Sequence, residues 1–176
     1  GLGRLYLLDS EKGPFTIYTF DDYEAELVKF VENGNYDVPF DYNIPMYADG
    51  YEITSISDRC FIECGLIYSV TIPQSVKSIG DEAFYYCYNL SSITIPNSVK
   101  SIGNSAFSNC GALTEVELGI GVESIGDYAF IYCKSLNSVV LPNSVKELGS
   151  YAFNSCERLT NIELSNALTS IGDSTF

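Results

Sequence analysis

The feature that most constrains this fold is a 23-residue phrase that recurs with almost no insertion along most of the chain. Its clearest copy spans residues 93–115, and the copy before it, residues 70–92, agrees with it at 13 of 23 positions without a gap. A fixed period of this length is the signature of a solenoid, in which each repeat packs only on its neighbours. One elongated domain is therefore predicted.

The boundaries of the copies follow from the same alignment. A degenerate first copy spans residues 42–69, four regular copies span residues 70–92, 93–115, 116–138 and 139–161, and a partial copy spans residues 162–176. Residues 1–41 are expected to form an N-terminal lead-in or cap. Within them, residues 15–20 are rich in β-branched and aromatic residues, which predicts a strand. Residues 23–31 fit a short helix about as well as a strand, because periodicity cannot assign so short an apolar run.

Each copy contains the same local signals, which are clearest in residues 93–115. Ile93 and Ile95 alternate with a threonine, which predicts a short strand with both isoleucines facing inward. Pro96 ends that strand because it cannot donate a further ladder hydrogen bond. Asn104 is placed to cap a short helix. That helix is predicted from four residues with helical spacing, which are Ala106, Phe107, Cys110 and Leu113.

Stacking the copies places each residue beside its counterpart in the next copy, so the core is expected to consist of columns. One column contains Phe61, Phe84, Phe107, Phe130, Phe153 and Phe176. A second contains Cys64, Cys87, Cys110, Cys133 and Cys156, expected to be buried free thiols that act as small apolar residues. A third contains Asp58, Asp81, Asn104, Asp127, Ser150 and Asp173. Helix capping explains every member of this third column, whereas calcium binding explains only its carboxylates.

Charge and composition exclude several function classes. The net charge is −14, from 9 Lys and Arg against 23 Asp and Glu, and this opposes binding to nucleic acid or to anionic membranes. The chain contains no histidine, which removes Ser-His and Cys-His catalysis and all His-ligated metal sites. No apolar run approaches the ~20 residues of a membrane span, and no signal peptide is recognisable. We therefore expect no catalytic residues, metal, cofactor or membrane insertion.

The phrase Ile-Pro-x-Ser-Val-x-Ser-Ile-Gly-x-x-Ala-Phe-x-x-Cys-x-x-Leu, present as residues 95–113, resembles the BspA-like leucine-rich repeats. The resemblance covers residues 42–176. It implies a right-handed α/β solenoid of the leucine-rich-repeat type, in which short parallel strands and short helices alternate. It also implies a β-hairpin before the array, which favours a strand for residues 23–31. The sequence departs from the repeat at Gly119, Gly121 and Cys60, and these changes are expected to affect local turns and packing rather than the fold.

The same resemblance implies a place on bacterial or protist cell-surface or secreted proteins, with adhesion to host or neighbouring-cell proteins. Our first hypothesis is therefore an extracellular protein-binding module. The second is a structural spacer within a larger protein, without a specific ligand. The partial last copy ends on an inward-facing Phe176 without a polar cap, so we expect either a fragment or self-association through that end.

Candidate binding residues are those that vary within the repeat. Aromatic and apolar residues replace polar ones at several positions of the predicted helices, and tyrosine is favoured at protein interfaces. These residues are Tyr85, Tyr86, Tyr88, Tyr128, Ile131, Tyr132 and Tyr151. The alternative is the outward face of the predicted sheet, represented by Thr71, Thr94, Glu115, Glu117, Val140 and Glu163. The glutamates of this alternative surface favour a basic ligand.

Overall fold

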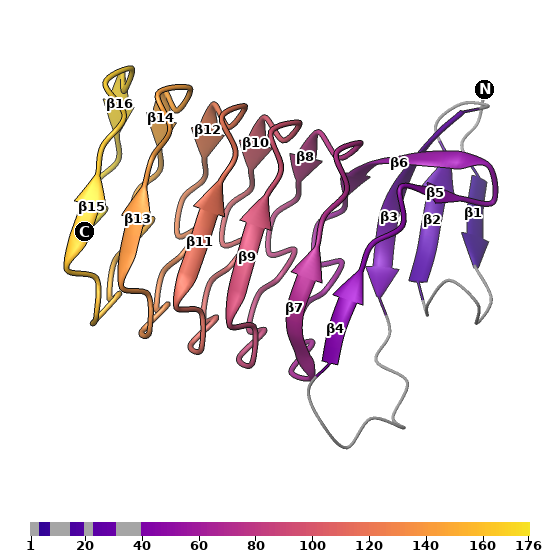
Figure 1. The fold of residues 1–176 in the computed structure, drawn as a ribbon, viewed down its shortest axis with the longest axis horizontal. Coiled ribbons are helices and arrows are strands. Elements are labelled where there is room, and N and C mark those ends of the chain that lie inside the picture. The colour runs from indigo at the N-terminus through magenta and orange to yellow at the C-terminus, as the bar shows by residue number, and fades with distance from the viewer. Residues whose placement is uncertain (1–3, 8–14, 20–22, 31–39) are drawn as a thin grey trace.

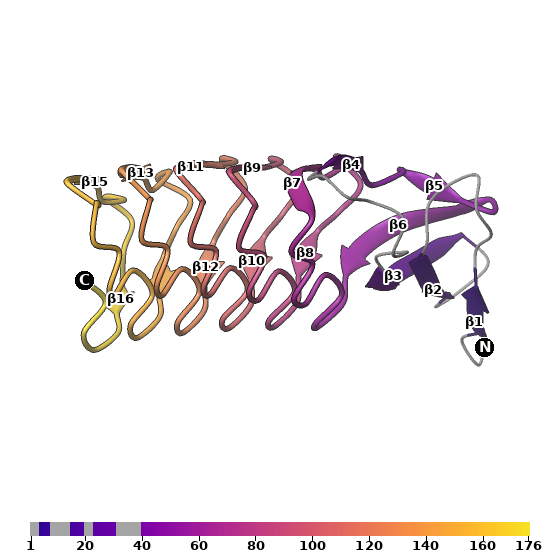
Figure 2. The same cartoon turned by 90° about the horizontal axis from the view of Figure 1, so that it is seen from below.

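The computed structural model describes residues 4–7, 15–19, 23–30 and 40–176, and it shows a parallel β-solenoid (Figure 1). Each coil after residue 66 contributes one strand to each of two sheets, A and B. Paired residues in neighbouring coils are one 23-residue repeat apart, as in the pair Ser92 and Glu115. Seen along the sheets, the coils stand side by side in a single row (Figure 2). The repeat period of the sequence is therefore the period of the fold.

Sheet B consists of parallel strands along one side of the row. In spatial order they are β15 (Asn161–Glu163), β13 (Ser138–Val140), β11 (Glu115–Leu118), β9 (Ser92–Ile95), β7 (Ile67–Thr71) and β4 (Phe40–Asn43). Side chains alternate along each strand, so that Ile93 is buried and Thr94 is exposed. Strand β9 ends before Pro96, as predicted. One face of this sheet therefore packs on the core and the other is open to solvent.

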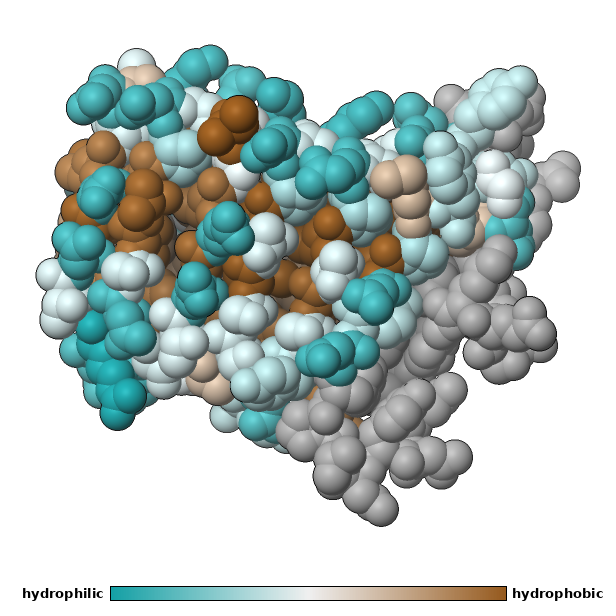
Figure 3. Space-filling view, in the orientation of Figure 1, coloured by the Kyte–Doolittle hydropathy of each residue, from teal (hydrophilic) through white to brown (hydrophobic). Residues whose placement is uncertain are grey.

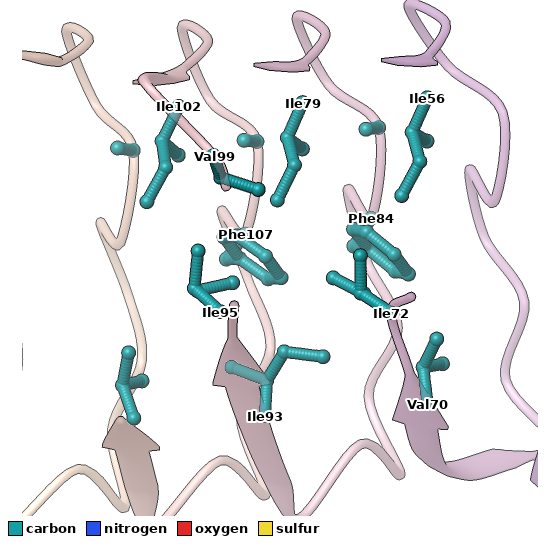
Figure 4. Packing of buried hydrophobic residues seen from close by; sticks show 14 of the residues in the cluster. Ile56, Val70, Ile72, Ile79, Phe84, Ile93, Ile95, Val99, Ile102 and Phe107 are labelled. Atoms are coloured by element: carbon teal, nitrogen blue, oxygen red, sulfur yellow. The ribbon is translucent and has the colours of Figure 1, made fainter. Parts of the chain in front are cut away.

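Sheet A closes the opposite side of the core. Its parallel strands are β6 (Tyr51–Ile56), β8 (Ser78–Ile79), β10 (Ser101–Ile102), β12 (Ser124–Ile125), β14 (Glu147–Leu148) and β16 (Ser170–Ile171). A short strand, β5 (Tyr47–Ala48), pairs antiparallel with β6. Ile93 and Ile95 from sheet B point toward Val99, Ile102 and Phe107 of the same coil (Figure 4). All five are at most 2% exposed, so little of their apolar surface contacts water.

The N-terminal strands extend sheet A. They are β1 (Arg4–Leu7), β2 (Phe15–Thr19) and β3 (Glu24–Phe30). Strands β2 and β3 are antiparallel, and β3 pairs in parallel with β6. The segment that the residues left open between helix and strand is thus β3, and Ala25 and Leu27 on it are fully buried. Where the cap ends and the array begins stays a prediction, as does the right-handed sense of the coil.

The predicted short helices are wrong, because the described residues contain no helix. Consecutive turns replace them, and backbone donors alternate between two kinds of partner. Phe84 N–H donates to the carbonyl of Ala106 in the next coil at 2.7 Å, whereas Tyr85 N–H donates within its own coil to Glu82 at 3.0 Å. The phenylalanine rings of neighbouring coils lie 4.8–5.2 Å apart in the middle of the column. An α-helix is about 10 Å wide, so helices could not stack at this spacing.

The phenylalanine and cysteine columns are confirmed. The rings stack nearly parallel, with interplanar angles between 1° and 4° along the whole column from Phe61 to Phe176. Each thiol from Cys87 to Cys156 donates to the carbonyl of a phenylalanine in the preceding coil, as Cys110 does to Phe84 at 3.2 Å. The cysteine position therefore needs a small side chain that also donates a hydrogen bond, which goes beyond the apolar role expected from the sequence.

The third column does not cap helices, so that interpretation of Asp58, Asp81, Asn104, Asp127, Ser150 and Asp173 is wrong. Instead, each side chain from Asp58 to Ser150 accepts a hydrogen bond from the backbone N–H of its counterpart in the next coil. Asp81 Oδ1, for example, accepts from Asn104 N at 2.7 Å. The same bond recurs from Asp58 to Ser150. The sequence indicates correctly that these side chains accept backbone hydrogen bonds. The N–H donors, however, lie in the next coil and not in the first turn of a helix.

Candidate functional site

A shallow hollow of about 370 Å³ lies on the turn side of the solenoid and contains three of the candidate tyrosines. It is lined by Tyr86, Tyr88, Asn109, Gly111, Tyr132 and Lys134. We call it the tyrosine hollow. The three tyrosine side chains are 46, 51 and 45% exposed, so roughly half of each is available for contact. Tyr86 and Tyr88 meet edge to face, with ring centroids 5.9 Å apart.

The walls of the tyrosine hollow come from one column of the repeat. Tyr86, Asn109, Tyr132 and Ser155 occupy equivalent positions in successive coils, and their φ angles are 58–60°. This left-handed backbone costs about 1–2 kcal/mol for an ordinary L-residue and less for asparagine. The fold therefore accepts small polar residues here, as Asn109 and Ser155 show. Tyr86 and Tyr132 are bulky side chains placed at a backbone position that disfavours them.

The other three lining residues, Tyr88, Gly111 and Lys134, come from a second column, and Gly111, which has no side chain, forms the floor between them. The ring of Tyr88 lies directly beside Gly65, where a Cβ atom would collide with it. At the other side, Lys134 Nζ pairs with Glu157 at 2.8 Å. This hydrogen bond, together with the carboxylate charge, raises the pKa of Lys134. Tyr88 and Lys134, in the coils before and after Gly111, therefore each contact the next coil on the side away from Gly111.

The other candidates of this group are placed elsewhere. Tyr128 and Tyr151 stack on each other, with ring centroids 5.1 Å apart and planes at 7°, and they do not line the hollow. Tyr85 packs beside Tyr86 at 6.1 Å. Ile131 is only 9% exposed, so it lies below the surface and offers little area to a partner. The seven residues thus divide into three that line the tyrosine hollow, Tyr85 beside it, a stacked pair and a buried isoleucine.

The alternative surface is the outward face of sheet B, which Figure 3 shows from the front. Its six predicted residues are all exposed, and Thr94 Oγ1 donates to Glu117 Oε2 at 3.2 Å. Hydrophobic residues gather toward the end of this face over β13 and β15 (Figure 3). Val140 and Leu164, which are 52 and 46% exposed, belong to this end. The face is therefore mixed in character and not uniformly acidic.

Sequence reasoning missed several exposed apolar residues, and Ile120 and Tyr68 are two of them. Ile120 is 73% exposed, and it stands where other copies have Gln74, Asn97, Asn143 and Asn166. Tyr68 is 51% exposed at the start of β7. The same rule that singled out the tyrosines, an apolar residue at a position that other copies fill with polar ones, could have found Ile120. Tyr68 lies in the degenerate copy, where alignment is weakest.

The ionisable groups with shifted pKa values include buried thiols of the core and members of surface ion pairs. Burial raises the pKa of the Cys110 and Cys133 thiols well above its ordinary value, and burial raises the pKa of Cys156 to about 11. Thiols with raised pKa values are poor nucleophiles at neutral pH. A hydrogen bond from Lys146, and then the charge of Lys146, lower the pKa of the exposed Glu123. In the described part of the chain, no cluster of three or more Cys, Asp or Glu could hold a metal ion.

Comparison with known proteins agrees with this architecture. A family model described as the BspA type leucine rich repeat region matches residues 54–176 in six copies. A leucine-rich repeat protein from Bacteroides ovatus has a solved structure that is 32% identical, with a TM-score of 0.85 over 97% of this chain and 44% of that one. A leucine rich cell surface protein from Faecalibacterium prausnitzii is 27% identical, with a TM-score of 0.82 over 98% of this chain and 46% of that one.

A third solved structure, a leucine rich repeat protein from T. pallidum, shares the fold at 23% identity, with a TM-score of 0.76 over 95% of this chain and 85% of that one. The chain spans less than half the length of the two proteins from B. ovatus and F. prausnitzii. A search of curated proteins found no match. Among the described residues, none forms a helix long and apolar enough to cross a membrane.

Proposed function

Because the chain belongs to the BspA-type leucine-rich repeat family, we propose that it is a non-enzymatic module of a cell-surface or secreted protein that binds other proteins through its exposed side chains. Adhesion to a host or neighbouring-cell surface protein is the form of binding that the family suggests. The relative from F. prausnitzii, described as a cell surface protein, supports the location. The net charge of −14 argues against nucleic acid as the partner.

The observation that carries this proposal is the tyrosine hollow. Tyrosine combines a large apolar area with a polar tip and loses little conformational freedom on binding, which suits it to protein interfaces. Tyr86 and Tyr132 hold this area half exposed, at a backbone position where smaller residues are favoured. Folding therefore does not explain why tyrosine stands there.

Binding to intact cells tests the proposal. The fluorescently labelled chain is incubated with bacterial and epithelial cells, before and after the cells are treated with a protease that removes surface proteins. We expect saturable binding that protease treatment abolishes. The triple variant Tyr86→Ser, Tyr88→Ser, Tyr132→Ser is expected to bind at least ~10-fold more weakly, since loss of central aromatic contacts typically costs that much or more.

The double variant Tyr128→Ser, Tyr151→Ser is the matched control, because it removes one exposed and one partly exposed tyrosine outside the hollow. Equal binding by the triple variant and the wild type would reject the tyrosine hollow. A variant of the alternative surface, Glu117→Lys with Val140→Glu, then tests sheet B. Binding that survives protease treatment would contradict a protein partner.

A structural spacer is the second candidate, and the continuity of the hydrogen-bond ladders favours it. Sheets A and B and the turn side all link each coil to the next through backbone bonds, so the row of coils is suited to hold other domains apart. A spacer predicts no saturable cell binding by any form of the chain. Self-association through the end that carries Phe176, which is 55% exposed, stays a separate prediction. Light scattering across a concentration series would test it.

A further inference from the structure

We infer that the tyrosine hollow receives one aromatic side chain of the protein partner, which inserts between Tyr86 and Tyr132 above Asn109 and Gly111. This inference rests on the proposed function and specifies the chemistry of its contact. It comes from three features of the structure, which are the spacing of the coils, the glycine at the floor and the partners of the surrounding polar groups.

Coil spacing sets the size of the gap. Phe84, Phe107 and Phe130 belong to the same three coils as Tyr86, Asn109 and Tyr132, and their ring centroids are separated by 5.0 and 5.2 Å. Equivalent positions two coils apart are therefore about 10 Å apart. Aromatic pairs are favourable at centroid separations of ~4.5–7 Å. One ring placed between Tyr86 and Tyr132 would thus lie within contact range of both.

Gly111 keeps this gap open without a structural need for glycine. Most other described glycines have a reason in the fold: at Gly103 a Cβ would lie 2.6 Å from the backbone nitrogen of Asp81, and Gly50 has a φ of +85°. A Cβ at Gly111 would meet nothing within 4 Å, and its φ lies outside the left-handed region. Any larger residue would project into the tyrosine hollow. Packing therefore does not require glycine at this position, and the missing side chain leaves the tyrosine hollow open.

The surrounding polar groups favour an aromatic ring over a sugar. Lys134 Nζ is engaged by Glu157 at 2.8 Å, and Asn109 Nδ2 donates to Ser108 Oγ at 2.9 Å. A saccharide needs several donors and acceptors for its hydroxyl groups, and each of these two side chains already has one of its hydrogen-bonding sites engaged within the protein. The contact area that remains is chiefly the tyrosine rings. Aromatic side chains use such a surface fully, because their binding relies on area and ring geometry.

The test is a nuclear magnetic resonance titration of the whole chain with N-acetyl-tyrosinamide. We expect the backbone amide signals of Asn109 and Gly111 to shift in a saturable way in the millimolar range, as suits so small a probe. N-acetyl-leucinamide, which has no ring, should shift them at least ~5-fold less at equal concentration. Methyl β-glucopyranoside represents the sugar alternative and should leave them unchanged.

Two variants fill the tyrosine hollow in different ways. Asn109→Tyr adds the missing ring to the column at a backbone position where tyrosine already stands twice, and Gly111→Leu blocks the floor. Both should lose the response to N-acetyl-tyrosinamide, whereas Tyr128→Ser, outside the hollow, should retain it. Thermal melting of each variant verifies that it is folded. Two independent filling variants keep the test decisive if one of them fails to fold.

Several results would overturn the inference: no saturable shift at Asn109 or Gly111, an equal response to the leucine probe, a stronger response to the glucoside, or a response that both filling variants retain. Cell binding that depends on the tyrosines while the probe gives no shift would leave the proposed function standing and reject the inserted ring. Conversely, a specific response to the probe combined with no cell binding by the wild type would reject the protein partner and with it the inference.

Discussion

Two columns of aromatic residues run along this solenoid, and they differ in burial and continuity. The phenylalanine column is unbroken from Phe61 to Phe176, and its members from Phe61 to Phe153 are at most 2% exposed. The column of Tyr86 and Tyr132 is about half exposed and is interrupted by Asn109. The same coil spacing positions both. The period of the fold therefore creates aromatic columns, but burial decides whether a column holds the fold together or is available to a partner.

The two columns also differ in how strictly the repeat fixes the residue type at each position. The carbonyl oxygen of Phe84 accepts hydrogen bonds from both Cys87 N and Cys110 Sγ. This one atom therefore links the backbone of its own coil to a buried thiol of the next coil. In the tyrosine column, residues as different as Tyr132 and Ser155 occupy the same backbone conformation. Substitutions should therefore be costly in the first column and tolerated in the second, and four predictions test this contrast in order of expected effect.

The largest effect is expected from Phe130→Ala. The ring stacks on Phe107 and Phe153 at 5.2 Å on each side and is fully buried. Its removal leaves a cavity between two coils, and the free energy of unfolding should fall by about 3–5 kcal/mol. Urea denaturation monitored by circular dichroism measures it. A loss below ~1 kcal/mol would mean that the coils collapse around the gap and that the column is not the main source of stability.

The second contrast compares two glycines. Gly103→Ala places a Cβ 2.6 Å from backbone atoms of the preceding coil, and it should destabilise the chain by about 1–3 kcal/mol. Gly111→Ala meets no atom within 4 Å and should leave stability unchanged or raise it by up to ~1 kcal/mol, because alanine restricts the unfolded chain. Parallel urea titrations compare the variants. Equal losses at both sites would refute the view that Gly111 has no packing role.

A smaller loss is expected from Asp81→Ala, which removes the acceptor of the Asn104 backbone N–H. The bond is partly open to water, so the free energy of unfolding should fall by about 1 kcal/mol. Asp81→Asn is the matched control, because Asn104 makes the same bond to Asp127 with an amide oxygen at 2.8 Å. The hydrogen-exchange rate of the Asn104 amide should rise in the alanine variant and stay low in the asparagine variant. Unchanged exchange in both would argue against the ladder.

The smallest effect is expected from Tyr132→Asn, on the same coil as Phe130. The variant loses the half of the ring that is buried, but asparagine suits the left-handed backbone better, and the two contributions oppose each other. A net change of about 1 kcal/mol or less is expected. Thermal melting beside Phe130→Ala gives the comparison directly. A loss as large as that of Phe130→Ala would place Tyr132 with the core.

Much of this architecture could be predicted from the residues. The repeat period and the phenylalanine column follow from the alignment of the copies, and the inward Ile93 and Ile95 and the stop at Pro96 follow from the pattern within one copy. The helix over residues 104–113 was the main error. The spacing of Ala106, Phe107 and Cys110 does indicate one buried face, but consecutive turns can bury the same residues, and a single copy does not reveal which applies.

The candidate site was predictable only in part. Tyr86 and Tyr132 were recognised because the copy spanning residues 93–115 has Asn109 at their position. The same rule also selected Ile131, which is buried, because variation within the repeat does not report depth. The repeat does separate Gly103, which recurs in every regular copy, from Gly111, which does not, but only the atoms of the neighbouring coil show what a Cβ would meet at each.

The sequence by itself determined which residues share a column, because a repeat of constant length places equivalent residues one coil apart. Only the tertiary structure decided how far apart the coils lie, and this distance has two consequences. At about 5 Å it is too short for helices, which are ~10 Å wide, so the turn side is linked coil to coil by hydrogen bonds. Twice this coil spacing sets the gap between Tyr86 and Tyr132. No single copy of the repeat contains that distance.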